Sequence, residues 1–170
     1  MSEVTIRFAT AADAATIVLL IRALADYEHL IGKVRISEAD VLRDGFGERP
    51  CFECLLAESD EAAVGFALFY HTYSTFAGRP ELWVEDIFVA EAARGRGVGR
   101  ELMARLGAIA LERDCAHLAL SVLHWNPAQD FYRRLGLEHV QDWLSYRVDR
   151  EGIARLAAGE RLSRAGSGAT

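Results

Sequence analysis

A glycine-rich loop between an apolar run and a helical pattern constrains this chain more than any other stretch. Residues 82–89 read LWVEDIFV, residues 94–100 read RGRGVGR, and apolar residues then recur at helical spacing. This order predicts a strand, a turn and a helix. The first amide groups of a helix have no intrahelical partner and carry the positive end of its dipole, so the turn predicts an anion site.

The predicted turn holds three glycines and three arginines. Glycine lets the backbone approach a phosphate and adopt positive φ, while arginine adds positive charge. A dinucleotide fingerprint GxGxxG begun at Gly95 would need glycine or alanine at position 100, where Arg100 stands, and the Gly-Lys-Ser/Thr of a P-loop is absent. Neither NAD nor ATP is therefore favoured as the bound anion. The loop alone also fits a turn that binds no anion and whose arginines are solvated.

The composition is that of an ordinary soluble globular protein. The 170 residues are 51% hydrophobic and 26% charged, with a formal net charge of −6. We expect one domain over residues 1–162 and a disordered tail over residues 163–170. The acidic balance argues against nucleic acid as a partner. The N-terminal residues lack a secretory signal pattern and no apolar run approaches membrane-spanning length, so we expect a cytoplasmic protein without membrane contact.

The cysteines and histidines do not form a metal-binding pattern. Cys51 and Cys54 lie three residues apart in a strand-like run, which sends the thiols to opposite faces, and Cys115 is isolated. The five histidines are scattered. We therefore expect reduced structural cysteines and no bound metal.

The order of elements predicts an α/β fold with mixed α+β character. Capping boxes at Thr10–Asp13 and Ser37–Asp40 begin two helices. Further helices are expected after the glycine loop and at residues 131–135 and 150–158. Strands are expected at residues 4–8, 51–58, 64–73, 82–89 and 118–123, and one or two more within 137–148. This order predicts a central mixed, mostly antiparallel sheet flanked by helices on both faces.

Two segments in this order resemble a known family. The loop at residues 94–99 resembles the Arg/Gln-x-x-Gly-x-Gly/Ala loop of the GNAT superfamily of N-acetyltransferases, and WNPAQDFYRRLG at residues 125–136 resembles its later Asn…Phe-Tyr-x-x-x-Gly segment. Other stretches, among them LADYE at 24–28, DGFG at 44–47 and LWVED at 82–86, look like the diamine (spermidine/spermine and thialysine) N-acetyltransferase subfamily. The resemblance spans residues from about 4 to 157 and implies the GNAT fold.

The resemblance implies acetyl transfer from acetyl-CoA to a primary amine, by direct attack in a ternary complex. Loop amides would hold the pyrophosphate, the strand backbone would pair with the pantetheine, and a residue at the neighbouring strand end would also contact the cofactor. The implied cofactor-binding residues are Ile87, Phe88, Val89, Arg94, Gly95, Arg96, Gly97, Val98, Gly99, Arg100 and Asn126. The family's general acid, a tyrosine that protonates the departing thiolate, falls on Tyr132. A packed aromatic side chain at a helix start is the alternative interpretation of Tyr132.

Two adjacent carboxylates stand in the otherwise apolar strand. An alkylammonium must lose a proton before it can attack, so the site needs a base. Alternation along a strand points Glu85 and Asp86 to opposite faces, and a carboxylate there is costly unless it is solvated, paired or functional. We expect Glu85 to act as the base through water and Asp86 to hold or orient the substrate. The alternative is that one of them pairs with an arginine.

The remaining substrate-side residues follow from the subfamily resemblance. Tyr27 and Glu28 match substrate-side positions, and an acidic contact to the polyamine falls on Gln141 or Asp142, because the chain is shorter there than the family pattern. The resemblance also implies a homodimer, with the region around Trp143 at the interface. Acetylation of another amine, such as an amino acid, an antibiotic or a protein N-terminus, and non-catalytic acyl-CoA binding remain the alternative functions.

Overall fold

The computed structural model describes residues 4–60 and 62–159. The chain divides into two compact units, Met1–Asn126 and Pro127–Thr170, which are described in turn. The predicted tail at residues 163–170 lies outside the described residues.

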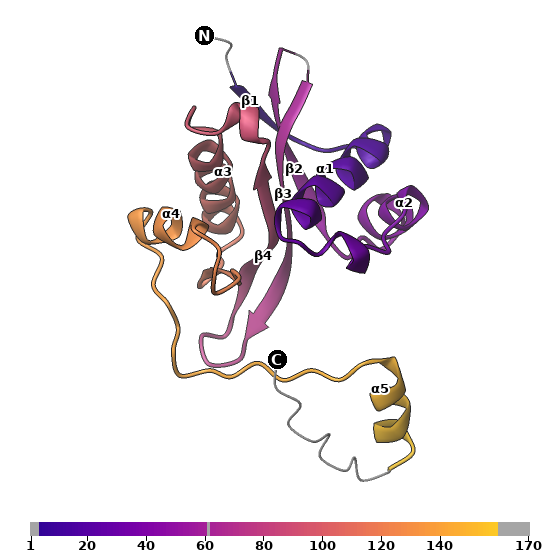
Figure 1. The fold of residues 1–170 in the computed structure, drawn as a ribbon. Helices are drawn as coiled ribbons and strands as arrows, with labels where there is room; N and C mark the ends of the chain where they lie inside the picture. The colour runs from indigo at the N-terminus through magenta and orange to yellow at the C-terminus, as the bar shows by residue number, and fades with distance from the viewer. Residues whose placement is uncertain (1–3, 61, 160–170) are drawn as a thin grey trace. The chain divides into compact units, whose positions relative to one another are not determined.

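The first unit is built on a sheet whose strands follow chain order (Figure 1). Over the described ranges this sheet has five strands, of which the first four pair antiparallel and the last pairs parallel with the fourth. They are β1 (Val4–Phe8), β2 (Glu53–Ser59), β3 (Ala62–Ser74), β4 (Arg79–Val89) and β5 (Leu118–Leu120). The mixed, mostly antiparallel sheet confirms the predicted fold class.

Helices cover both faces of this sheet, as expected. In Figure 1, α1 (Ala14–Tyr27) and α2 (Glu38–Phe46) lie on one side and α3 (Val98–Glu112) lies on the other. Single 3-10 turns occur at η1 (Ala11–Asp13), η2 (Ile31–Lys33) and η3 (Glu91–Ala93). The core between α1, α2 and the sheet includes Ile17, Val41, Leu56, Phe66 and Leu68, and the buried stripe of α3 contains Val98, Leu102, Leu106 and Ile109. Burial of these stripes is the main driving force for the layered arrangement.

Both predicted capping boxes form. The Ser37 hydroxyl accepts a hydrogen bond from the Asp40 amide at 3.3 Å, and the Asp40 carboxylate accepts one from the Ser37 amide at 2.9 Å. The Thr10–Asp13 box begins the 3-10 turn η1 rather than the α-helix itself. Helix α1 starts at Ala14, directly after this turn. Each box satisfies amide groups that a helix start would otherwise leave without partners.

β4 changes its pairing halfway along its length. Leu68 of β3 lies opposite Asp86 and Phe69 lies opposite Val84, so Glu85 is the extra residue of a β-bulge. Pairing with β5 ends at Val84 and Leu120, although β4 continues to Val89. Over the described residues, the last part of β4 therefore has one edge without a strand partner.

The second unit contains α4 (Ala128–Arg134) and α5 (Arg150–Ala157). No strand forms within residues 137–149, all of which the structure describes, so the prediction of one or two strands there is wrong. A strand exists only where another strand supplies hydrogen-bond partners, and an alternating pattern does not provide that partner. For the same reason the strand predicted at 118–123 ends at Leu120, where its pairing with β4 ends.

Candidate functional site

The helix N-terminus after the glycine loop is open. Gly97 is the N-cap residue of α3 with φ 87°, Gly95 has φ 74°, and no side chain among the described residues caps the helix. A Cβ at either glycine would meet no atom within 4 Å, so the backbone angle and not crowding requires glycine here. The first amide groups of α3 are thus positioned to hold an anion.

The unpaired edge of β4 runs towards this helix start. The Ala90 amide donates to the Val64 carbonyl at 2.8 Å on the β3 side. Backbone groups alternate in direction along a strand, so those of Val89 and Ile87 face the opposite, open edge. The backbone of Phe88 faces β3, and its side chain is part of the core. A ligand lying along this edge would find backbone partners mainly at Ile87 and Val89.

Arg94 connects the loop to the end of α1. Its Nε donates to the Val89 carbonyl at 3.0 Å, and its guanidinium lies 4.5 Å from the centre of the Tyr27 ring and 5.8 Å from that of Phe88. Cation–π contacts of this kind favour a fixed position for the guanidinium. Arg96 and Arg100 lie exposed on the loop and on the first turn of α3. Arg94 thus links the loop to the predicted substrate side.

The bulge brings Glu85 and Asp86 to the same face of the sheet, which corrects the expectation of opposite faces. The carboxylate of Glu85 bonds to Tyr70, and Asp86 lies opposite Leu68, two residues before Tyr70 on β3. Residues i and i+2 of a strand share a face, and Leu68 belongs to the core under α1. Simple alternation fails here because the extra residue of the bulge turns two successive side chains to one side.

The carboxylate of Asp86 on this face lies within electrostatic reach of two others. Burial raises the pKa of Asp86 to about 6, with further contributions from the negative charges of Glu85 and Glu28. Burial also raises the pKa of Glu28, which directly follows α1. Partly buried carboxylates that repel one another favour a cation between them. The structure thus places the predicted substrate residues Glu28, Glu85 and Asp86 within electrostatic reach of one another, and Tyr27, which precedes Glu28, lies under Arg94.

Asn126 lies near the same end of α1. It is 6% exposed, and its amide donates to the Leu123 carbonyl at 2.9 Å. The preceding residue, Trp125, stacks on His29, with ring centres 5.7 Å apart. The segment that carries a predicted cofactor contact therefore touches the loop that carries the predicted substrate contacts.

Sequence reasoning missed four residues around this site. The Trp83 indole and the Tyr70 hydroxyl both donate to Glu85, and His29 stacks on Trp125. Trp83 could have been found, because it lies two residues from Glu85 on the same strand. The contacts of Tyr70, His29 and Trp125 depend on residues far apart in the sequence, so no local signal marks them.

Tyr132 and Asp142 belong to the second unit. Tyr132 lies on α4, and its ring meets the ring of Phe131 edge-on, at 5.3 Å between centres. Its carbonyl accepts the Leu137 amide at 3.1 Å. Asp142 is exposed in the irregular segment 137–149.

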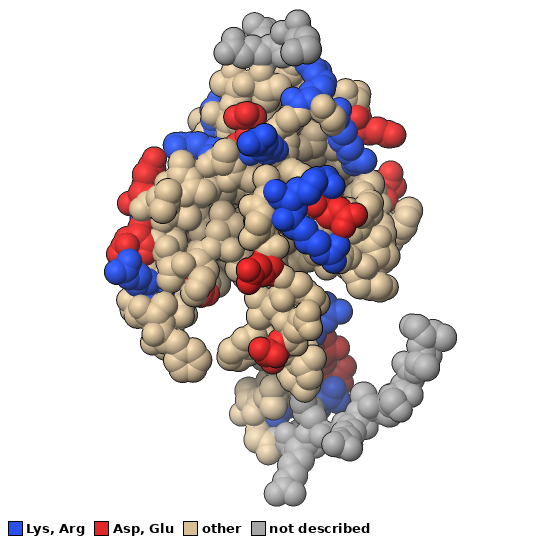
Figure 2. All heavy atoms as spheres, turned by 90° about the vertical axis from the view of Figure 1, so that its left-hand side faces the viewer, with Lys and Arg blue, Asp and Glu red and all other residues tan. Residues whose placement is uncertain are grey.

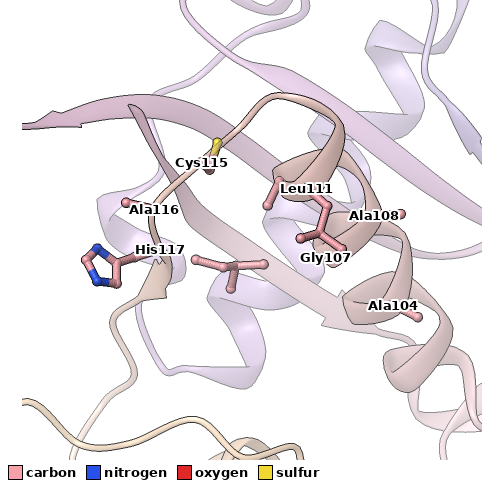
Figure 3. A pocket seen from close by; sticks show the side chains of 9 residues that line it. Ala104, Gly107, Ala108, Leu111, Cys115, Ala116 and His117 are labelled. Carbon is pink, nitrogen blue, oxygen red and sulfur yellow. The ribbon is translucent and has the colours of Figure 1, made fainter. Parts of the chain in front are cut away.

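A cavity in the first unit lies apart from the residues predicted to act. It has a volume of about 580 Å³ and is formed by α3 and the chain leading into β5. Figure 3 shows Ala104, Gly107 and Leu111 of α3 on one side and Cys115 and His117 on the other. None of the predicted site residues lines this cavity, so it is not the predicted catalytic site.

Other classes of site find little support. On the face in Figure 2, basic side chains occur in small groups with acidic side chains beside them. Among the described residues no group of three or more histidine, cysteine, aspartate or glutamate side chains could hold a metal ion. Within the same ranges, no helix has both the length and the apolar composition needed to cross a bilayer.

Comparison with known proteins gives a consistent result. The model of the Acetyltransferase (GNAT) family matches residues 15–137. The chain is 39% identical to the thialysine N-epsilon-acetyltransferase of Sus scrofa, over 92% of this chain and 99% of that protein. It is 36% identical to the spermidine/spermine N(1)-acetyltransferase-like protein 1 of Homo sapiens, over 92% of this chain and 24% of that protein. An integron cassette protein from the mobile metagenome of V. cholerae has a similar structure, with a TM-score of 0.77 and 26% sequence identity. The match covers 92% of this chain and 98% of that protein.

Proposed function

The chain belongs to the acetyltransferase (GNAT) family and is an N-acetyltransferase, and from this premise we propose that it acetylates a primary amine of a small cationic acceptor. The acetyl donor in this proposal is acetyl-CoA, and the amine attacks it directly in a ternary complex. One observation carries the proposal: within the first unit, the charges of Glu28, at the end of α1, and of Glu85 act on the partly buried Asp86, and Tyr27 of the same helix end contacts Arg94 of the loop before α3. A site for a cation thus adjoins a site for an anion.

The residues present fit coenzyme A. Bound acetyl-CoA would supply the acetyl group as a thioester. The glycine turn and the open start of α3 offer amide donors for a pyrophosphate, and the free edge of β4 offers backbone partners for an extended amide chain. The residues proposed to hold it are Ile87, Val89, Arg94, Gly95, Arg96, Gly97, Val98, Gly99, Arg100 and Asn126. Phe88 is left out of this set, because its backbone faces β3 and its side chain is part of the core.

Glu85 is the proposed base. Its side chain is exposed, so water can reach its carboxylate and carry the proton away from the ammonium group. Asp86 is more deeply buried, and together with Tyr27 and Glu28 it is proposed to hold the cationic acceptor. A pKa of about 6 also suits Asp86 to accept a proton near neutral pH, which makes it the second candidate for the base.

Tyr132 is the proposed general acid, which donates its phenolic proton to the departing sulfur. Its place in the matched segment and its restraint by the edge of the Phe131 ring support this role. A restrained ring limits the directions that its hydroxyl can take, which favours proton transfer in the transition state.

The proposed acceptors are diamines, polyamines and thialysine-like amines. The names of the similar proteins of Sus scrofa and Homo sapiens support this class, as does the clustering of Glu28, Glu85 and Asp86. Asp142 is proposed as a further acidic contact. Acetylation of another amine would use the same cluster, and an acceptor panel separates the two possibilities.

We further propose that the protein is a single domain over residues 1–162, a cytoplasmic protein and a homodimer with the region around Trp143 at the interface. Trp143 is 74% exposed in the described chain, which supports its burial by a second copy.

The decisive experiment measures thiol release from acetyl-CoA with putrescine, spermidine, thialysine, free amino acids and an aminoglycoside. We expect turnover with the first three. Tyr132→Phe and Glu85→Gln should each lower kcat by about 10²-fold or more, with little change in KM for acetyl-CoA. If Asp86→Asn lowers kcat more than Glu85→Gln does, the base is Asp86.

Tyr146→Phe is the matched control for Tyr132→Phe, because Tyr146 is 89% exposed in the same unit. Equal turnover of the wild type and Tyr132→Phe would show that Tyr132 is not the general acid. Thiol release only with amino acids or the aminoglycoside would overturn the proposed acceptor class, and binding of acetyl-CoA without thiol release would indicate a non-catalytic protein.

A further inference from the structure

Two neighbouring side chains hold the carboxylate of Glu85, and we propose that Tyr70 and Trp83 are positioning residues that direct this carboxylate for proton removal from the amine. The inference deepens the proposed function and rests on it. It adds two residues that sequence reasoning did not connect with the reaction.

Both donors converge on one oxygen. The Trp83 indole donates to Glu85 Oε2 at 3.0 Å, and the Tyr70 hydroxyl donates to the same oxygen at 3.2 Å. Tyr70 and Trp83 lie directly opposite each other in the β3–β4 ladder. One cross-strand pair therefore supplies both hydrogen bonds, and the distance between the two donors is set by the pairing of the strands.

The second oxygen of Glu85 has a different environment. Among the described residues, no donor bonds to Oε1. An oxygen that already accepts two hydrogen bonds has less capacity to accept a proton than one that accepts none. Oε1 is therefore the oxygen that would take the proton from the water or the amine.

Glu85 needs such a restraint because of its position. It is the extra residue of the bulge, so it has no ladder partner on β3, and its side chain is exposed. A free glutamate side chain loses rotamer entropy when it is fixed in one direction. Two donors that are fixed in the sheet favour one direction before the substrate arrives.

Tyr70 remains a donor at neutral pH. Burial and the charge of Glu85 raise the pKa of its hydroxyl above the ordinary value. The hydroxyl therefore keeps its proton, and Tyr70 donates to Glu85 rather than competing with it as a base.

The test compares Tyr70→Phe and Trp83→Phe with the wild type, in the thiol-release assay with the best acceptor of the panel. Each variant should lower kcat by about tenfold while KM for acetyl-CoA stays the same, because the cofactor residues are untouched. Tyr73→Phe is the matched control, since Tyr73 lies on the same strand, is 64% exposed and should keep wild-type kcat.

A double-mutant cycle separates positioning from a structural role. If Tyr70 and Trp83 act through Glu85, their replacement in a Glu85→Gln background should cause no further loss of kcat. The same tenfold loss in that background would overturn the positioning role, as would wild-type kcat in both single variants. Thermal melting of each variant detects misfolding, and a loss of kcat that follows a lowered Tm would also count against the proposal.

The two proposals fail in different ways. If the wild type released no thiol with any amine, acetyl transfer itself would be overturned, and the positioning role with it. If the wild type turned over and the losses were additive with Glu85→Gln, only the positioning role would be overturned.

Discussion

Asp86 shows, at the scale of single residues, how a site can oppose the stability of its own fold. Its carboxyl group lies in the sheet face under α1, near Glu85 and Glu28. Burial and like charges both disfavour ionisation, and its pKa rises from its ordinary value of 3.8 to about 6. In the unfolded chain the Asp86 carboxyl group ionises without this free-energy cost, so ionised Asp86 destabilises the folded protein. A bound cationic amine would offset this destabilisation.

We expect Asp86→Asn to stabilise the protein at neutral pH. The folded pKa lies above the unfolded one, so the folded chain binds more protons between about pH 4 and pH 6, and stability falls as the pH rises through this window. Removal of the charge should raise the free energy of unfolding by about 1–3 kcal/mol at pH 7 to 8. Urea denaturation at pH 8 and pH 4 measures this gain, which should nearly vanish at the lower pH.

Asp26→Asn is the control for this prediction, because Asp26 is an exposed carboxylate on α1. It should change the stability little at either pH. A loss of stability in Asp86→Asn at pH 8 would show that the carboxylate is paired favourably in the folded protein.

At the scale of elements, the start of α3 depends on backbone angles. Gly97 and Gly95 have positive φ, and Gly107 lies in the middle of the same helix, with open space where a Cβ would stand. The three glycines therefore differ in what they do. The first two permit a turn that most residues avoid, whereas Gly107 only weakens the helix.

Gly97→Ala and Gly107→Ala should thus have opposite effects on stability. Alanine at position 97 must adopt the left-handed region, which costs roughly 1–2 kcal/mol, and alanine at position 107 should add about 0.5–1 kcal/mol. Gly97→Ala should also weaken binding of coenzyme A, measured by calorimetry, whereas Gly107→Ala should not. Equal binding by both variants would show that the turn does not hold the cofactor.

At the scale of the whole molecule, the second unit carries apolar side chains that a folded protein normally buries. Trp143, Leu144 and Tyr146 are 74%, 77% and 89% exposed in the irregular segment 137–149. Apolar side chains clustered in one exposed segment commonly mark an interaction site. The proposed homodimer would cover them.

We expect Trp143→Glu to convert the proposed dimer into a monomer. A charged side chain that loses water at an interface without a partner costs several kcal/mol, which is a large fraction of a typical dimer affinity. Light scattering after size-exclusion chromatography measures the mass, which is 18.8 kDa for a monomer and twice that value for a dimer. Leu19→Glu, at a 67% exposed position of α1, should leave the dimer intact. A monomeric wild type would contradict the proposal.

Local physical chemistry was enough to predict much of this protein from its sequence. The glycine turn, both capping boxes, the buried stripe of α3 and the succession of strands from β1 to β5 were predicted correctly, because each depends on residues close together in the chain. The family follows from two short motifs in the right order. The roles of all the site residues, Tyr132 and Asn126 among them, remain predictions.

The tertiary structure decided what depends on pairing between distant residues. The bulge that turns Glu85 and Asp86 to one face arises from the register of β4 against β3, and alternation alone predicted the opposite. The convergence of Tyr70 and Trp83 on Glu85 follows from the same pairing, whereas the approach of Glu28 to Asp86 follows from the packing of α1 on the sheet. The strand pattern at 137–148 formed no strand, because hydrogen bonds between strands need a partner. The sequence thus determined the chemistry available to this protein, and the sheet register decided which groups meet.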